Sequence, residues 1–230
     1  MHLIYLDMKL LNLIKGFFVL LIISFFPVHG KNILVGPNIG YWGSPGGSFE
    51  VSLLDLNKKF PMGFIIGAGY FFQNNPGNAE EARRIFINDN TGGVIQKDGT
   101  ILMTYFDITY PLYRSESFIF RLTAGPRYAK HTANFAFLGD NEVFDINSTP
   151  YGIGAGIRFD FELSKNFILK LGTGFDVYEK TQLGGHGKFY YDPDSIDDNP
   201  RQNYTYEDAD KAIYQPDKFI KFVIGIDYRI

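Results

Sequence analysis

Apolar and polar residues alternate along most of this 230-residue chain. The clearest run is YGIGAGIRFDFEL (151–163), in which apolar side chains occupy every second position and glycines or charged side chains occupy the others. Because successive side chains of a β-strand point to opposite faces, this period of two predicts a strand with one apolar face and one small or charged face. No apolar set recurs at helical spacing over several turns, so the pattern predicts an all-β protein.

The runs with this period follow one another from residue 32 to the end of the chain. They comprise residues 32–43, 48–54, 61–72, 101–112, 117–129, 151–163, 166–178 and 219–230. The long connections between them are residues 73–100, 130–149 and 179–218. Long and short connections alternate, except that SPGG (44–47) is short where a long one is expected. This order predicts an eight-stranded antiparallel up-and-down β-barrel with turns at one rim and long loops at the other.

Alternation alone does not decide whether the apolar face points into a soluble barrel or outward into lipid. The segment GYW (40–42) matches the Gly-x-Trp element of the soluble lipocalins. Lipocalins, however, have mostly short connections after a long first one, and this chain has the reverse. The small and charged face also carries many glycines, which make room for long side chains inside a narrow barrel. We therefore expect the apolar face to contact lipid.

Charged residues of both signs lie on the face that would then line the lumen. They are Glu50, Asp107, Arg121, Arg127, Arg158, Asp160, Glu162, Lys170, Asp176, Lys221, Asp227 and Arg229. A buried charge without a partner costs several kcal/mol, so we expect these side chains to form a nearly neutral network of ion pairs. Aromatic residues on the opposite face gather near the strand ends, as in the girdles of transmembrane barrels.

In its architecture, the chain resembles the small eight-stranded outer-membrane proteins of bacteria, the group of the outer membrane protein A transmembrane domain and outer membrane proteins X and W. Its most specific local element is the ending, where Gly225, Tyr228 and Ile230 match the Gly-x-x-aromatic-x-hydrophobic signal presented to the barrel-assembly machinery. Ile230 replaces the usual terminal Phe or Trp. The resemblance implies a transmembrane β-barrel in the bacterial outer membrane, with short periplasmic turns, long extracellular loops, and contacts to outer-membrane lipid and lipopolysaccharide.

The N-terminal region has the features of a secretory signal. Lys9 and Lys15 precede the apolar stretch GFFVLLIISFF (16–26), and Val28-His29-Gly30 follows as a small-x-small cleavage pattern. We expect a signal peptide at 1–30, with Met1 or Met8 as the start, and one barrel domain at 31–230. The chain has no cysteine and a formal net charge of −3. These values exclude disulfides and thiolate metal sites and do not indicate nucleic-acid binding.

Few residues suggest chemistry. His131 begins HTAN, and lipid A 3-O-deacylases carry a catalytic His two residues before a nucleophilic Ser, but that position is Ala133 here. Thr132 would have to substitute, although as the neighbour of His131 it points to the opposite face of a strand. The acidic segment 190–210 lacks the Gly and the closing Glu of an EF-hand loop. We therefore expect no metal and no other cofactor.

The pattern favours a monomeric, non-enzymatic outer-membrane barrel whose long loops mediate adhesion, contact with a host or the environment, or a role in membrane structure. Two alternatives stay open. One is a channel or lipid-binding barrel for small hydrophobic molecules, with Ile65, Phe71 and Ile119 lining an apolar pocket. The other is a lipid A-modifying hydrolase that uses His131.

Overall fold

A computed structural model describes residues 33–56, 61–90, 92–139, 142–185 and 204–230. The predicted signal peptide lies outside the described residues. The strands are β1 (Ile33–Trp42), β2 (Pro45–Leu53), β3 (Gly63–Gln73), β4 (Val94–Arg114), β5 (Phe118–Leu138), β6 (Glu142–Ser148), β7 (Tyr151–Glu162), β8 (Phe167–Glu179), β9 (Gly184–Gly185) and β10 (Lys218–Arg229). The helices are α2 (Ala79–Phe86) and α3 (Tyr206–Ala212), and within the described residues no helix is long and apolar enough to cross a membrane.

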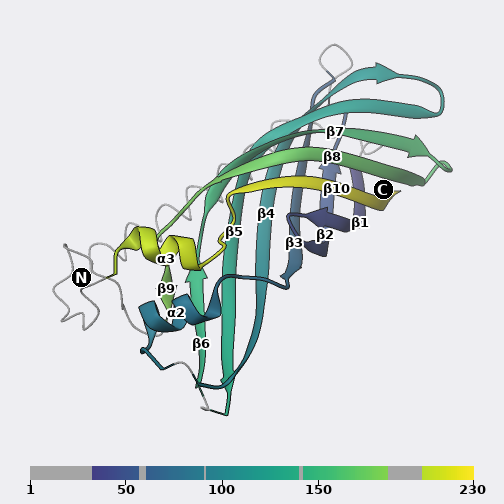
Figure 1. Cartoon of the computed structure of the whole chain (residues 1–230). Coiled ribbons are helices and arrows are strands. Elements are labelled where there is room, and N and C mark those ends of the chain that lie inside the picture. The colour runs from purple at the N-terminus through teal and green to yellow at the C-terminus, as the bar shows by residue number, and fades with distance from the viewer. Residues whose placement is uncertain (1–32, 57–60, 91, 140–141, 186–203) are drawn as a thin grey trace, which may run out of the picture.

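Eight of the strands form a closed ring. The order around it is β1, β2, β3, β4, β5, β7, β8 and β10, and every neighbouring pair is antiparallel (Figure 1). The ring closes between the first and last strands, where Leu34 is opposite Arg229 and Asn38 is opposite Gly225. Closure removes the free edges of the sheet. The predicted eight-stranded up-and-down barrel is confirmed.

The two sets of alternating residues lie on opposite faces of this ring, one facing the lumen and the other facing outward. Charged side chains are buried within, whereas large apolar side chains are exposed on the outer wall, for example Ile39, Phe49, Tyr70, Leu122, Ile153, Phe175 and Ile224. Soluble monomers rarely expose so continuous an apolar surface, so the outer wall needs lipid around it. Glycines make room inside: a Cβ atom on Gly154 would come within 1.9 Å of the Asp176 carboxylate and 2.5 Å of the Arg127 guanidinium.

The connections between strands differ from the prediction. Residues 94–100 and 130–138, expected to be loops, extend β4 and β5 as one long hairpin. β6 pairs with this extension of β5 from His131 to Phe137, and β9 pairs with β6. The prediction was wrong here because it ended the two runs at residues 101 and 129, whereas the backbone pairing continues to Val94 and Leu138. A hairpin can continue beyond the membrane wherever its inner face finds something to pack against.

The extended hairpin packs against both helices. We use "the cap" for α2, α3, β6, β9 and the extensions of β4 and β5 (94–99 and 131–138), which lie together at the end of the barrel away from the C-terminus (Figure 1). The cap has its own apolar core. Its buried members are Ala79, Ala82, Ile85, Phe86, Ala133, Phe135, Phe137, Phe144, Ile146, Leu183, Ala209, Ala212 and Ile213. The described parts of the long connections therefore form a folded unit.

Local signals in the sequence account for the two helices. Asn78 caps α2 by accepting a hydrogen bond from the Glu81 amide at 3.4 Å, and Thr205 with Asp208 forms a capping box at the start of α3. The backbone then joins the segments that precede and follow the helices. The Asn78 amide donates to Ala212 O at 2.7 Å, and the Tyr214 amide donates to Pro76 O at 2.8 Å. This pairing holds the connection after β3 against the connection before β10.

Candidate functional site: the ion-paired lumen and its cap

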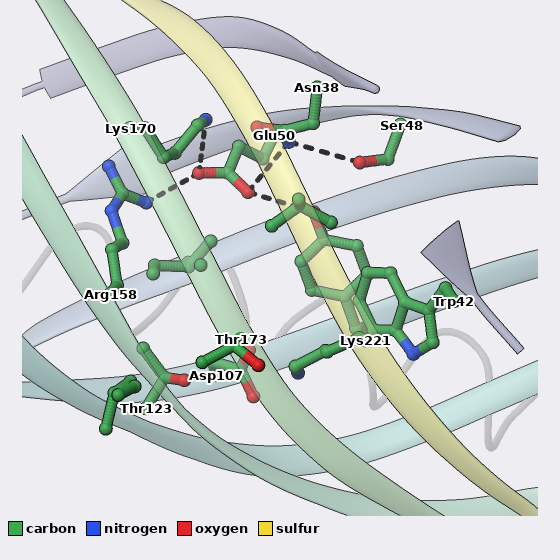
Figure 2. A pocket seen from close by; sticks show the side chains of 15 residues that line it. Asn38, Trp42, Ser48, Glu50, Asp107, Thr123, Arg158, Lys170, Thr173 and Lys221 are labelled. Carbon is green, nitrogen blue, oxygen red and sulfur yellow. Dashed lines mark hydrogen bonds and ion pairs between the residues drawn. The ribbon is translucent and has the colours of Figure 1, made fainter. Parts of the chain in front are cut away.

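The first group of buried charges surrounds Glu50 of β2 (Figure 2). Lys170 Nζ lies 2.7 Å and Arg158 Nη1 lies 2.6 Å from Glu50 Oε1. The Tyr105 hydroxyl donates to Oε2 at 2.9 Å, and the Asn38 amide donates to the same atom at 3.2 Å. Side chains from four strands other than β2 thus donate hydrogen bonds to one carboxylate. Both of its oxygens have partners although the side chain is buried.

Arg158 links this group to two further carboxylates. Its Nη2 lies 2.8 Å from Asp227 Oδ2, while Lys170 Nζ lies 2.6 Å from Asp227 Oδ1. Arg158 also pairs with Asp160, which accepts a second ion pair from Arg121 Nε at 3.0 Å. The cations and anions alternate, so every charge in this part of the lumen faces the opposite sign.

Asp55 ends the chain of ion pairs near the turn rim. It lies in the connection after β2, with a φ of 51°, and its carboxylate is 3.1 Å from Arg121 and 2.6 Å from Arg114. Burial alone would raise the pKa of Asp55, but the two guanidinium groups outweigh this and hold its pKa below the ordinary value. Sequence reasoning missed Asp55 because it does not lie on an alternating strand.

A second group of charges is centred on Arg127. The guanidinium binds Asp107 with two hydrogen bonds of 2.7 and 3.1 Å, and its Nε lies 3.1 Å from Asp176. Lys221 Nζ is 3.3 Å from the other oxygen of Asp176, and the Trp42 indole donates to Asp176 as well. This group contains two cations and two carboxylates, so it is neutral overall.

Aromatic side chains adjoin the second group. The Trp42 ring lies 5.7 Å from Phe71 and 5.2 Å from Tyr105 between ring centroids, and Lys221 Nζ is 4.6 Å from the centre of the Trp42 ring. The Tyr178 hydroxyl donates to Met103 Sδ at 3.2 Å. These side chains fill the lumen between the charges and the cap.

Little empty space is left among these groups. A cavity of about 50 Å³ lies between Asn38, Glu50, Lys170 and Lys221, which is room for a water molecule or two. A second cavity, of about 140 Å³, opens at the turn rim beside Asp55 and Arg121. Neither cavity offers a solute a route through the barrel.

Most of the predicted lumen residues lie where the alternation puts them. Those with buried side chains are Glu50, Asp107, Arg121, Arg127, Arg158, Asp160, Lys170, Asp176, Lys221 and Asp227. Glu162 and Arg229 are the exceptions: they pair with each other at 2.6 Å, with side chains that are 42% and 28% exposed. Each is the last residue of its strand, at the turn rim, so the pair lies outside the buried network.

His131 lies opposite Ser148 in the β5–β6 pair, but no hydrogen bond joins the two side chains. The His131 side chain is fully buried on the inner face of β5, and its Nε2 is 2.7 Å from Gln73 Oε1. Thr132 points to the other face and donates to Asn147 at 2.8 Å, so it lies out of reach of the imidazole. Among the described residues, no cluster of three or more His, Asp or Glu side chains could hold a metal ion.

Solved structures share this arrangement of strands. A major outer membrane protein from Thermus thermophilus matches with a TM-score of 0.67 and 21% sequence identity, over 88% of this chain and 100% of that one. This chain has the fold of the small outer-membrane β-barrel proteins. Less similar structures are Ail, the attachment invasion locus protein of Yersinia pestis (TM-score 0.43, 12% identity, 87% of this chain and 97% of that one), and Neisserial surface protein A (TM-score 0.42, 9% identity, 87% and 97%).

No protein-family model matches the sequence of this barrel, and no curated protein matches it. In outer-membrane barrels the short turns face the periplasm and the long loops face the outside of the cell. The cap is built from the long connections, so it stands at the rim of the barrel opposite the short turns, with the ion pairs of the lumen between the two rims.

Proposed function

We propose that this protein is a non-enzymatic outer-membrane barrel whose cap binds a partner outside the cell. One observation carries the proposal: the cap is a folded unit that displays apolar side chains at its far end. Val94, Leu138 and Val143 are 68%, 47% and 64% exposed. Loops held on a rigid scaffold commonly carry binding functions, and an exposed apolar cluster marks an interaction surface.

These side chains share one face of the extended sheet. Val94 is opposite Leu138, and Val143 is opposite Ala136, which is two residues before Leu138 on the same face of β5. The other face of β5 holds Phe135 and Phe137 in the cap core. Alternate residues of β5 point to opposite faces, so burying this cluster in the cap core would expose Phe135 and Phe137. The cluster therefore stays on the surface, where a partner can bind it. We call Val94, Ala136, Leu138 and Val143 "the tip cluster".

The filled lumen disfavours the channel alternative. Ile65 and Phe71 are buried and pack with Trp42 and its neighbours, and of the two only Ile65 lines the cavity of about 50 Å³. Ile119 adjoins the small cavity at the turn rim. We expect no stepwise conductance from the protein in planar lipid bilayers at moderate voltage. Stepwise conductance that depends on the protein would contradict a closed lumen and favour transport.

The hydrolase alternative has no nucleophile hydrogen-bonded to His131: Ser148 is directly opposite it in the β5–β6 pair, but the Ser148 hydroxyl and His131 Nδ1 are both buried without a hydrogen-bond partner among the described residues. The imidazole contacts an amide oxygen, and the only hydroxyl next to it in sequence faces the other way. A nucleophile and its base must be within hydrogen-bond reach, directly or after a small adjustment. We therefore expect lipid A to be unchanged when the protein is produced in a lipid A-containing host, with or without His131→Ala.

The proposed location is the bacterial outer membrane, with outer-membrane lipid and lipopolysaccharide around a monomeric barrel. The last strand supports recognition by the assembly machinery: Tyr228 and Ile230 are 45% and 62% exposed on the outer wall. Gly225 faces inward, where a Cβ atom would come within 2.6 Å of the Pro37 backbone oxygen and 2.1 Å of Asn38 Oδ1. Closing the barrel thus requires a glycine at this position of the proposed signal.

Adhesion of cells that display the protein tests the role of the cap. We expect the wild-type protein to increase retention of cells on other cells or on coated surfaces, relative to cells with an empty vector. Leu138→Asp combined with Val143→Asp should abolish the increase, since both changes put charge into the tip cluster. Leu163→Asp is the matched control because Leu163 is 60% exposed in the turn after β7, at the periplasmic end. Equal adhesion of the tip variant and the control, at equal surface levels, would contradict the proposal.

A further inference from the structure

A groove of about 600 Å³ lies in the outer wall of the barrel, apart from the lumen and the cap. Gly67, Ala68 and Thr104 line it, together with the larger side chains of Phe49 and Tyr128. Ala68 and Thr104 are exposed and point outward from β3 and β4. The groove exists because small side chains stand here among large apolar ones.

The register of the strands shows the course of the groove. Phe49 is opposite Ala68, Ala68 is opposite Thr104, Thr104 is opposite Tyr128, and Tyr128 is opposite Tyr151. These residues form one row across five neighbouring strands. With neighbouring strands about 4.8 Å apart, the row is roughly 19 Å long, which is enough for most of a fatty-acyl chain.

The row descends from the edge of the lipid-facing belt toward its middle. On β5, Tyr128 is the last apolar side chain of the outer face before Lys130, and Tyr151 is the first residue of β7. On β3, in contrast, Ala68 is followed toward the extracellular end by Tyr70 and Phe72, which are 45% and 55% exposed to lipid. One end of the groove therefore lies at the membrane surface and the other within the hydrocarbon.

Lys130 marks the end of the groove at the membrane surface. It is exposed on the outer face of β5, opposite Leu102 of β4 and two residues from Tyr128. None of the ion pairs among the described residues involves Lys130. A cation at this depth meets the headgroups of the outer leaflet, where it attracts an anionic group.

We propose that this groove binds one acyl chain of an anionic lipid from the outer leaflet, with the lipid headgroup next to Lys130. The position of the groove in the lipid-facing belt identifies the occupant as a lipid, because hydrocarbon chains surround this wall. A peptide strand would need a free sheet edge, and β2, β3, β4 and β5 are paired on both sides along the groove. The site requires the membrane location of the barrel but no adhesive role of the cap.

Native mass spectrometry of the full chain can measure which lipid stays bound. The protein is incubated in detergent with equal amounts of phosphatidylglycerol and phosphatidylcholine that carry the same acyl chains. We expect one retained lipid, with phosphatidylglycerol preferred about fivefold, the size of effect given by one lysine at an anionic lipid surface. Lys130→Gln should remove the preference and leave retention. Ala68→Phe should remove retention of both lipids, because its ring fills the floor of the groove.

Matched substitutions elsewhere separate this site from general effects on the barrel. Lys218→Gln removes an exposed lysine at the extracellular end of β10, and Ala155→Phe adds a ring to an exposed alanine of β7 outside the groove. Both controls should behave as the wild type does. Thr104→Phe fills the same floor from the next strand and replaces Ala68→Phe if that variant does not fold, as judged by heat-modifiable migration on gels. Absence of a retained lipid on the wild type, or a preference that survives Lys130→Gln, would overturn the proposal.

Discussion

The lumen and the cap are both packed interiors, but ion pairs fill the first and apolar side chains fill the second. Both are interiors bounded by β5, and both consist mainly of buried side chains. In the lumen, Arg127 and Arg158 join carboxylates from several strands. In the cap, the continuation of the same face of β5 contributes Phe135 and Phe137, which pack on Phe144 with ring centroids 5.4 and 6.3 Å apart. One strand thus takes part in an ionic core at one end and an apolar core at the other.

The difference follows from what lies on the other side of each wall. The outer face of the barrel must be apolar to face lipid, so polar side chains can be placed only inside, where they need partners. The outer face of the cap meets water and can carry Asn134 and Asp145, which pair with each other at 2.6 Å. The cap can therefore have an ordinary apolar core. The two regions should respond differently to the loss of a single side chain.

The largest effect is expected in the lumen. Arg158→Met removes the cation shared by Glu50, Asp160 and Asp227 and leaves excess negative charge buried. Breaking a buried ion network by removing one partner costs about 4 kcal/mol. Urea unfolding of the barrel in lipid vesicles, followed by the gel shift of the folded form, measures the loss.

An exposed ion pair provides the control for this prediction. Arg229→Met breaks the pair with Glu162 at the turn rim, where both side chains are partly exposed. Exposed ion pairs contribute about 0 to 1 kcal/mol, so this variant should unfold near the wild-type urea concentration. If both variants were equally stable, the buried charges would not form the core described above.

A smaller and local effect is expected in the cap. Ile146 of β6 is fully buried in the cap core, and Ile146→Ala should cost about 3 kcal/mol through lost burial and the cavity left behind. Because the cap has a core separate from the lumen, the loss should appear as faster proteolysis and faster amide exchange in α2, α3 and β6. Val143→Thr, on the exposed face of the same strand, is the control. Equal loss of protection in the barrel strands would show that the two regions unfold as one unit.

The sequence predicts the lumen well and the cap poorly, for a physical reason. In the barrel, each strand has the same period, and the side-chain period alone assigns Arg121, Lys170 or Asp227 to the interior. The period of two continues in HTANFAFL (131–138), where Ala133, Phe135 and Phe137 alternate with polar or small residues, so a signal for the extension is present. A strand can continue in this way outside the membrane, because bilayer thickness limits only the part of a hairpin that lipid surrounds.

The alternation of apolar and polar residues does not predict the contacts that the connections between strands make. Asp55, in the connection after β2, binds Arg121, and Arg83 of α2 pairs with Glu142 at the start of β6. In EEARRIF (80–86), Glu80 and Glu81 stand three or four residues before Arg83 and Arg84, a spacing that suits the helix α2, but spacing does not show which face of that helix meets the sheet. Such contacts depend on how separate elements pack.

The smallest effect is expected at the capping box of α3. The Thr205 amide and hydroxyl donate to the Asp208 carboxylate at 2.9 and 2.7 Å, and these hydrogen bonds lower the pKa of Asp208 below 3.8. Because the pKa of Asp208 is lowered in the folded protein, the capping box stabilises α3 at pH values above the ordinary pKa of an aspartate. This stabilisation is lost as the pH falls through the pKa of Asp208 in the folded protein. Thr205→Ala keeps the amide donor and removes the hydroxyl, so it should weaken α3 by about 1 kcal/mol. Titration of the Asp208 carboxyl carbon by NMR should show a midpoint below 3.8 in the wild type and a higher midpoint in the variant. An unchanged midpoint would mean that the hydroxyl does not bind this carboxylate in solution, and that the other contacts of α3, such as Ala209 and Ala212 in the cap core, hold the helix in place.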